Sequence, residues 1–110
     1  MNNSRISEKD WKIIRSMKDN LRNVACSRIL KRIYALIKNE EESAHEIYLQ
    51  LWKTMRDEDK EFSICFDDIK RSNAVFKVSV WKRNGLISDD QIKRFSDEAQ
   101  QSIRKIEELW

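Results

Sequence analysis

The chain has 110 residues, the size of one ordinary domain, with 37% charged and 40% apolar residues and a net charge of +3. It contains no proline and a single glycine, so it lacks the turn residues on which β-hairpins and meanders depend, whereas this composition suits long amphipathic helices. The apolar fraction is too high for a disordered chain, and no apolar run approaches the roughly 20 residues that span a bilayer.

The first predicted helix covers residues 8–38. Ser7 is expected to be its N-cap, and Asp10 can reach back to the Ser7 backbone as in a capping box. Two apolar series then follow at helical spacing, on different faces. They are Trp11, Ile14, Met17, Leu21, Val24 and Ala25, and then Cys26, Ile29, Leu30, Ile33, Leu36 and Ile37. Either the helix breaks near residues 25–28 or its halves face different partners; because no breaking residue occurs there, we favour one long helix.

A second helix is expected after the turn at residues 39–42, because Ser43 and Glu46 have the spacing of a capping box. Its apolar face consists of Ile47, Tyr48, Leu51, Trp52 and Met55. The pattern fades in the charged stretch 57–61. The apolar residues at 62–66 are expected to form a link packed into the core.

Asp67 or Asp68 is expected to cap a third helix, since a carboxylate accepts from free N–H groups and suits the positive end of the helix dipole. Apolar residues lie around most of this helix, which should therefore be the most buried element. They are Ile69, Ala74, Val75, Phe76, Val78, Val80 and Trp81. The helix should end at Asn84, with Gly85 in the left-handed position after it and Leu86 in apolar contact.

Ser88 and Gln91 form another capping-box pair, which predicts the start of the last helix. Its apolar residues are Ile92, Phe95, Ala99, Ile103, Ile106 and Leu109. The residues at 96–98 could cap a helix again, so we allow for a kink at that point.

These elements predict one all-helical domain over residues 1–110, with an elongated hairpin stem at about 7–62 and a small head at about 67–110. A helix over residues 8–38 would be about 46 Å long, longer than the roughly 35 Å diameter of a compact domain of this size. Its second apolar stripe would then be exposed in a monomer, which predicts a homodimer. The alternative is a break near Cys26 that gives a compact monomer.

Charge is segregated along the sequence: residues 1–38 are strongly basic, residues 39–68 strongly acidic and the remainder mildly basic. Such blocks can pair within a chain or between chains, or can be solvated faces. Cys26 and Cys65 have no zinc or redox spacing and are expected to be reduced core residues. The start of the chain has no apolar segment of signal-peptide type, which predicts a cytoplasmic protein.

Chemistry-bearing motifs are sparse, and we expect no enzyme activity, metal or cofactor. His45 is the sole histidine and lies at a helix start. The acidic stretch 57–61 has neither the glycine nor the ligand spacing of a calcium loop, and a single glycine provides no phosphate-binding loop.

Nucleic-acid binding is the main alternative function, because eight basic residues of the first helix could neutralise phosphates. They are Lys9, Lys12, Arg15, Lys18, Arg22, Arg28, Lys31 and Arg32. A scaffold role without a ligand is a third option.

Two stretches, from Ser72 to Phe76 and from Trp81 to Ile87, resemble the C-terminal head of the fluorescence recovery proteins of cyanobacteria. Residues 90–92 and 100–103 continue the resemblance, which extends over roughly residues 20–104 without a gap. It implies an all-helical dimer with a long-helix stem and a small head. Members of that family are not enzymes; they bind the C-terminal domain of the orange carotenoid protein and speed its return to the resting orange form.

The chain departs from that family at several positions. A Trp and a following His-Asp pair on the second helix are replaced by Gln50, Lys53 and Thr54, an Arg by Lys60, and a Lys of the last helix by Ser102. We therefore interpret the chain as a divergent relative. The residues expected at its partner or dimer interface are Tyr48, Leu51, Trp52, Met55, Lys60 and Phe76.

Phe76 and Trp81 lie about 140° apart on their helix, so we expect one in the core and the other facing solvent or a partner.

Overall fold

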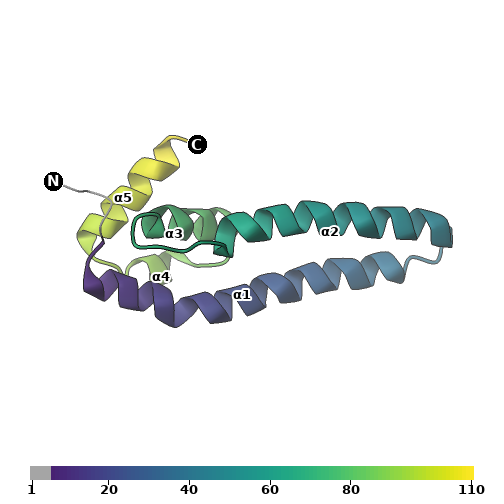
Figure 1. Ribbon diagram of the computed structural model, residues 1–110, viewed down its shortest axis with the longest axis horizontal. Helices are drawn as coiled ribbons and strands as arrows, with labels where there is room; N and C mark the ends of the chain where they lie inside the picture. Colours follow the sequence, from purple (N-terminus) through teal and green to yellow (C-terminus); the bar gives the residue numbers. More distant parts are fainter. Residues whose placement is uncertain (1–5) are drawn as a thin grey trace.

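The computed structural model describes residues 6–110, which form five helices and no strand. The helices are α1 (Glu8–Ile37), α2 (Ala44–Phe66), α3 (Ala74–Arg83), α4 (Asp89–Ile92) and α5 (Asp97–Glu108). The predicted all-helical class is confirmed. Figure 1 shows α1 and α2 as an antiparallel hairpin, with α3, α4 and α5 gathered at the end that holds the start of α1.

The part of the hairpin from Arg22 to Ile64 projects from the rest of the molecule, and we call it the arm; the remaining helical residues form the head. The α1 helix is continuous, with no break at residues 25–28. The described chain measures 57 × 23 × 22 Å, and its radius of gyration is 17.1 Å. A compact domain of this length would have a radius of gyration of about 13 Å. Every fully buried apolar side chain lies either at or before Leu21 or at or after Cys65. The core therefore belongs to the head, and the arm has none of its own.

The link expected at residues 62–66 is wrong: α2 continues through it to Phe66. Phe62, Cys65 and Phe66 recur at helical spacing and pack towards the core, so the helix gains burial by continuing. The charged residues before them are solvated on the arm and do not end the helix.

The predicted cap of the third helix is also wrong. Asp67 is the C-cap of α2, and Asp68 has a positive φ of 54°, so the chain turns there. The α3 helix begins only at Ala74. The side chain of Asn73 holds the intervening turn: its Oδ1 accepts from the Lys70 N–H at 2.8 Å, and its Nδ2 donates to the Asp68 carbonyl at 2.7 Å.

The end of α2 is capped by side chains of α3. Lys77 Nζ donates to the Ile64 carbonyl at 2.7 Å, and Trp81 Nε1 donates to the Cys65 carbonyl at 2.8 Å. The last carbonyls of a helix lack intrahelical partners, and a cation suits the negative end of the dipole. Trp81 is completely buried, whereas Phe76 is 43% exposed. This confirms the prediction, made from their angular separation, that only one of the two lies in the core.

The end of α3 is held by both local and distant groups. Gly85 has φ of 68°, and Leu86 N–H donates to the Trp81 carbonyl at 2.9 Å, which confirms the predicted glycine-terminated helix end. Arg28 of α1 adds two hydrogen bonds, to the carbonyls of Asn84 (3.2 Å) and Gly85 (2.9 Å). The arm is therefore fastened to the head at this point.

The expected last helix is two helices, because the chain leaves the helix after α4 and Ser96 caps α5. Ser7 caps α1 as expected, but Asp10 does not reach back to the Ser7 backbone. Its buried carboxylate instead accepts from both capping hydroxyls, Ser7 Oγ (2.9 Å) and Ser96 Oγ (2.6 Å), and from Ser96 N–H (2.8 Å). One carboxylate thus joins the positive ends of α1 and α5.

We expect Asp10→Asn to lower the free energy of unfolding by about 1–3 kcal/mol, because an amide cannot accept from all of these buried donors. Urea unfolding followed by circular dichroism, at one protein concentration, would measure the change. The matched control is Asp19→Asn on the exposed side of α1, which should change stability by no more than about 0.5 kcal/mol. Equal effects of the two substitutions would show that the buried carboxylate is not a structural junction.

The two free cysteines differ in burial: Cys65 is buried, as predicted, whereas the prediction for Cys26 is wrong, because it is half-buried on α1 and lies outside the core. Burial, and then the nearby Glu61, raise the pKa of the Cys65 thiol to about 11. The raised pKa means that the folded state favours the neutral thiol more than the unfolded state does. The buried Cys65 thiol therefore contributes to the free energy of unfolding below pH 9, and this contribution is lost as the pH rises through about 11.

Only the thiolate is a good nucleophile, so iodoacetamide at pH 8 should alkylate Cys26 well before Cys65 in the folded protein. Mass spectrometry of proteolytic fragments would follow the two sites, and urea should remove the difference. Labelling of Cys65 at the rate of Cys26 without urea would contradict its burial.

Candidate partner-binding surface

One line of side chains runs along the whole of α1. At 100° per residue its members fall within about 40° of the direction of Cys26. They are Glu8, Lys12, Arg15, Asp19, Arg22, Cys26, Leu30, Ile33 and Ile37. We call this line the α1 ridge. It is charged beside the head, with three basic and two acidic side chains, and apolar along the arm.

A matching line on α2 is formed by Tyr48, Trp52, Met55 and Asp59. The contact between the two helices is made by other residues, including Ala25 and Ile29 of α1 and Phe62 of α2, which line the cleft between them. Both ridges are displaced from this contact in the same rotational sense. Because the helices are antiparallel, the ridges therefore lie on the same side of the hairpin.

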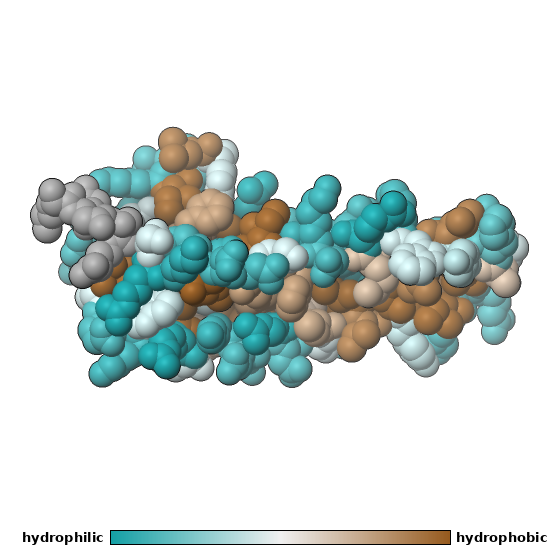
Figure 2. Space-filling view, in the orientation of Figure 1, coloured by the Kyte–Doolittle hydropathy of each residue, from teal (hydrophilic) through white to brown (hydrophobic). Residues whose placement is uncertain are grey.

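The apolar parts of the two ridges form one surface, which we call the hairpin face and define as Leu30, Ile33, Ile37, Tyr48, Trp52 and Met55. Leu30 is 65% exposed, Trp52 57%, and both Ile37 and Tyr48 56%. The Tyr48 and Trp52 rings meet edge to face, with their centroids 6.4 Å apart. Figure 2 shows hydrophobic side chains of both helices gathered along this side of the arm.

The residues predicted at an interface are divided among four places. Tyr48, Trp52 and Met55 lie together on the hairpin face, while Leu51 is half-buried towards α1. Lys60 is exposed but about 100° away from the ridge of α2. Phe76 lies on the head and is not part of the hairpin face.

The family resemblance would place an interface at Gln50, Lys53 and Thr54. Gln50 lies about 160° around α2 from Trp52, so these positions point away from the hairpin face. Lys53 is exposed and pairs with Asp57 at 3.7 Å. The exposed apolar surface of this arm is therefore on a different side of α2 from the positions that the resemblance implies.

A second apolar cluster lies on the head around Phe76, which is 43% exposed. The Trp110 ring meets Phe76 edge to face at 6.4 Å between centroids, and the Arg83 guanidinium lies 4.9 Å from the Trp110 centroid. Ile64 at the end of α2 is also exposed and lines the same hollow. The last residue of the chain thereby completes this cluster, which no periodicity of the sequence indicates.

The cleft between the two arm helices encloses about 60 Å³, room for only a few water molecules. Its charged groups already have partners in the protein: Arg32 pairs with Glu58 at 2.6 Å, and Arg28 binds the end of α3. Two of the eight basic residues considered for phosphate binding are therefore engaged internally at the cleft, and a third, Arg22, pairs with Asp19 at 3.5 Å. The cleft has neither the volume nor the free polar groups of a ligand site.

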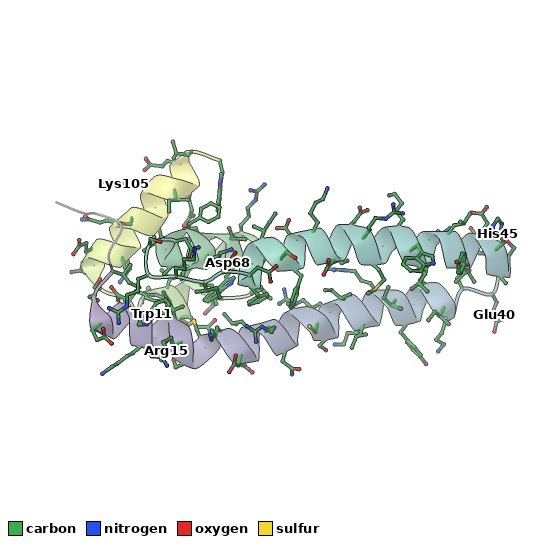
Figure 3. All side chains as sticks on the ribbon, in the orientation of Figure 1. Trp11, Arg15, Glu40, His45, Asp68 and Lys105 are labelled. Atoms are coloured by element: carbon green, nitrogen blue, oxygen red, sulfur yellow. The ribbon has the colours of Figure 1, made fainter. Side chains whose placement is uncertain are left out.

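Within residues 6–110 no cluster of three or more acidic, cysteine or histidine side chains could hold a metal ion. His45 is exposed in the first turn of α2, at the hairpin tip labelled in Figure 3, far from both cysteines along the helices. Among the same residues, a search for a helix with the length and apolar character of a transmembrane span finds none.

Comparison with protein-family models, with curated proteins and with solved structures finds no match to this chain. The resemblance to fluorescence recovery proteins is therefore carried by the residues of the sequence alone.

We expect Phe76→Ala to leave the chain folded and to lower the free energy of unfolding by about 1 kcal/mol, because the ring is only partly buried. Phe95→Ala is the matched core substitution and should cost about 3–5 kcal/mol. Urea unfolding of the two variants would compare them. If Phe76→Ala unfolds the protein, Phe76 is a core residue and the head cluster is not a contact surface.

Proposed function

We propose that the chain is a non-enzymatic, homodimeric regulator that works by binding another protein. Two copies would associate through the hairpin face, and each head would offer the Phe76 cluster to a partner. The cytoplasm as its location and the absence of a cofactor are parts of this proposal and depend on the sequence features above.

The observation that carries the proposal is the lack of a core in the arm. No residue from Arg22 to Ile64 is buried, although these residues form most of two long helices. Helices of this length gain most of their stability from tertiary packing of an apolar face. An exposed contiguous apolar surface on a soluble domain usually marks an interface. A second copy presents the same surface, and a two-fold axis makes such a surface self-complementary.

The resemblance to fluorescence recovery proteins extends the proposal to the partner, namely the C-terminal domain of a carotenoid-binding photoprotein. Phe76 lies in a stretch that resembles the head of that family, and its exposure supports a contact on the head. The side chains at Gln50, Lys53 and Thr54 differ from those of the family. They argue that the arm of this chain self-associates through a different side of α2, namely the hairpin face. Nucleic acid is the weaker candidate, because Arg28 and Arg32 are occupied and the tip of the arm is acidic.

Light scattering at micromolar concentration should give about twice the chain mass of 13.3 kDa. The double variant Leu30→Glu/Trp52→Glu should be a folded monomer, because charges on the hairpin face cannot be buried without partners. Leu109→Glu, on the exposed end of the head, is the matched control and should remain dimeric. A native chain with a mass near 13 kDa would rule out the homodimer.

The partner can be tested directly with photoactivated orange carotenoid protein. Added native chain should bind it on gel filtration and speed the return of its orange absorbance, and Phe76→Ala should weaken both effects. Absence of both effects would exclude this partner while leaving the homodimer in place.

A further inference from the structure

The single glycine of the chain follows an asparagine, and an Asn-Gly pair has a reactivity of its own. The main-chain nitrogen of the glycine can attack the side-chain amide carbon of the asparagine, because glycine has no side chain to shield that nitrogen. Asn84 and Gly85 form this pair at the end of α3. Gly85 has φ of 68°, a left-handed conformation that other residues adopt only with strain. The fold therefore requires, after Asn84, the neighbour that leaves its amide most open to attack.

The Asn84-Gly85 pair is held by groups from three helices. Asn84 Nδ2 donates to Glu61 Oε1 of α2 at 3.0 Å and to the Val80 carbonyl of α3 at 2.8 Å. Arg28 of α1 donates to the Asn84 and Gly85 carbonyls at 3.2 Å and 2.9 Å. We call Arg28, Glu61 and Asn84 the Asn84 clamp. The two arm helices thus fix both the amide and the peptide group that would attack it.

Attack on the amide requires a backbone geometry that this helix end does not have. The five-membered succinimide ring forms only when Asn84 Cβ and the Gly85 nitrogen are nearly eclipsed about the Cα–C bond. Asn84 has ψ of 5°, so its own nitrogen occupies that eclipsed position, and ring closure needs roughly a third of a turn about the bond. That rotation moves the Asn84 carbonyl away from Arg28 and breaks the bond from Gly85 N–H to the Lys82 carbonyl. The reaction therefore requires the clamp to open first.

We infer that Asn84 is a site of spontaneous deamidation that the docked arm protects and an undocked arm exposes. In the reaction the Gly85 nitrogen loses its proton and bonds to Asn84 Cγ, and the amide nitrogen leaves with a proton as ammonia. Water then opens the succinimide: opening at Cγ gives aspartate, and opening at the main-chain carbonyl gives isoaspartate. Water is the only co-reactant, and no atom is oxidised or reduced. This inference does not depend on the homodimer proposed above.

Both products oppose docking of the arm in its original position. A carboxylate has no hydrogen to donate to Glu61 or to the Val80 carbonyl, and it places a second negative charge beside the Glu61 carboxylate. Arg28 is already engaged with two main-chain carbonyls. Isoaspartate also adds one carbon to the main chain before Gly85, so the turn that ends α3 changes its spacing. The modification therefore records that the arm has opened.

Peptide mapping by mass spectrometry measures the reaction, because replacing the amide by a carboxylate changes the mass of the fragment that contains Asn84. We expect the folded native chain at pH 8 to deamidate there at least about tenfold more slowly than the same chain in urea. Arg28→Met should speed the reaction of the folded chain, because it removes both bonds to the carbonyls. Arg15→Met removes an exposed guanidinium from the same helix and is the matched control, which should react like the native chain.

The variant Asp10→Asn separates opening of the clamp from global unfolding, because it weakens the contact between α1 and α5, which does not involve the clamp. At urea concentrations that give Asp10→Asn and Arg28→Met the same free energy of unfolding, Arg28→Met should still deamidate faster. Equal rates would show that only global unfolding exposes Asn84 and would overturn the role of the arm. A native chain that deamidates equally fast with and without urea, or in neither condition, would overturn the assignment of the site.

The variant Asn84→Asp reproduces one of the products. Asn84 Nδ2 lies 3.8 Å from Cys65 Sγ, so alkylation of this buried thiol reports whether the arm is docked. Iodoacetamide should label Cys65 about threefold or more faster in Asn84→Asp than in the native chain. Asn39→Asp makes the same chemical change in the exposed turn at the tip of the arm and should leave the labelling rate unchanged. Native-like labelling of Asn84→Asp would show that the product does not hold the arm open.

Discussion

The capping of α2 by α3 is the contact on which the rest of the structure depends. A long helix that enters a small head must end there, and its last carbonyls must find donors away from water. Lys77 and Trp81 provide two of these donors from adjacent turns of α3. The same contact buries Trp81 against Phe66, with ring centroids 6.0 Å apart. It therefore sets both where the arm ends and how the head is oriented beneath it.

Local signals predicted the parts of the fold that local contacts determine. Ser7, Ser43 and Ser88 cap helices as their spacing indicated, and Gly85 ends α3. The errors concern groups whose partners are distant in sequence. The end of α2 depends on donors 13 and 16 residues further along the chain, and Asp10 bonds to a serine 86 residues away. No periodicity within a single helix contains that information.

The candidate surface was only partly accessible from the sequence for the same reason. Helical spacing identified the apolar residues of the arm and predicted that α1 would be longer than the diameter of a compact domain. It could not say that Leu51 packs inwards while Tyr48 and Trp52 stay exposed, because that depends on which side of α2 meets α1. The cluster of Phe76, Arg83 and Trp110 forms only when the end of α5 folds back beside α3.

The coreless arm has a consequence for the lifetime of the protein. Segments with few buried contacts open locally at little cost in free energy, so a single unassembled copy would expose the backbone of its arm to proteases far more often than its head. Association through the hairpin face, as proposed, would stabilise the arm by mass action and become more complete as the chain concentration rises. In that case unassembled copies would be degraded first, and the amount of intact protein would follow the amount of dimer.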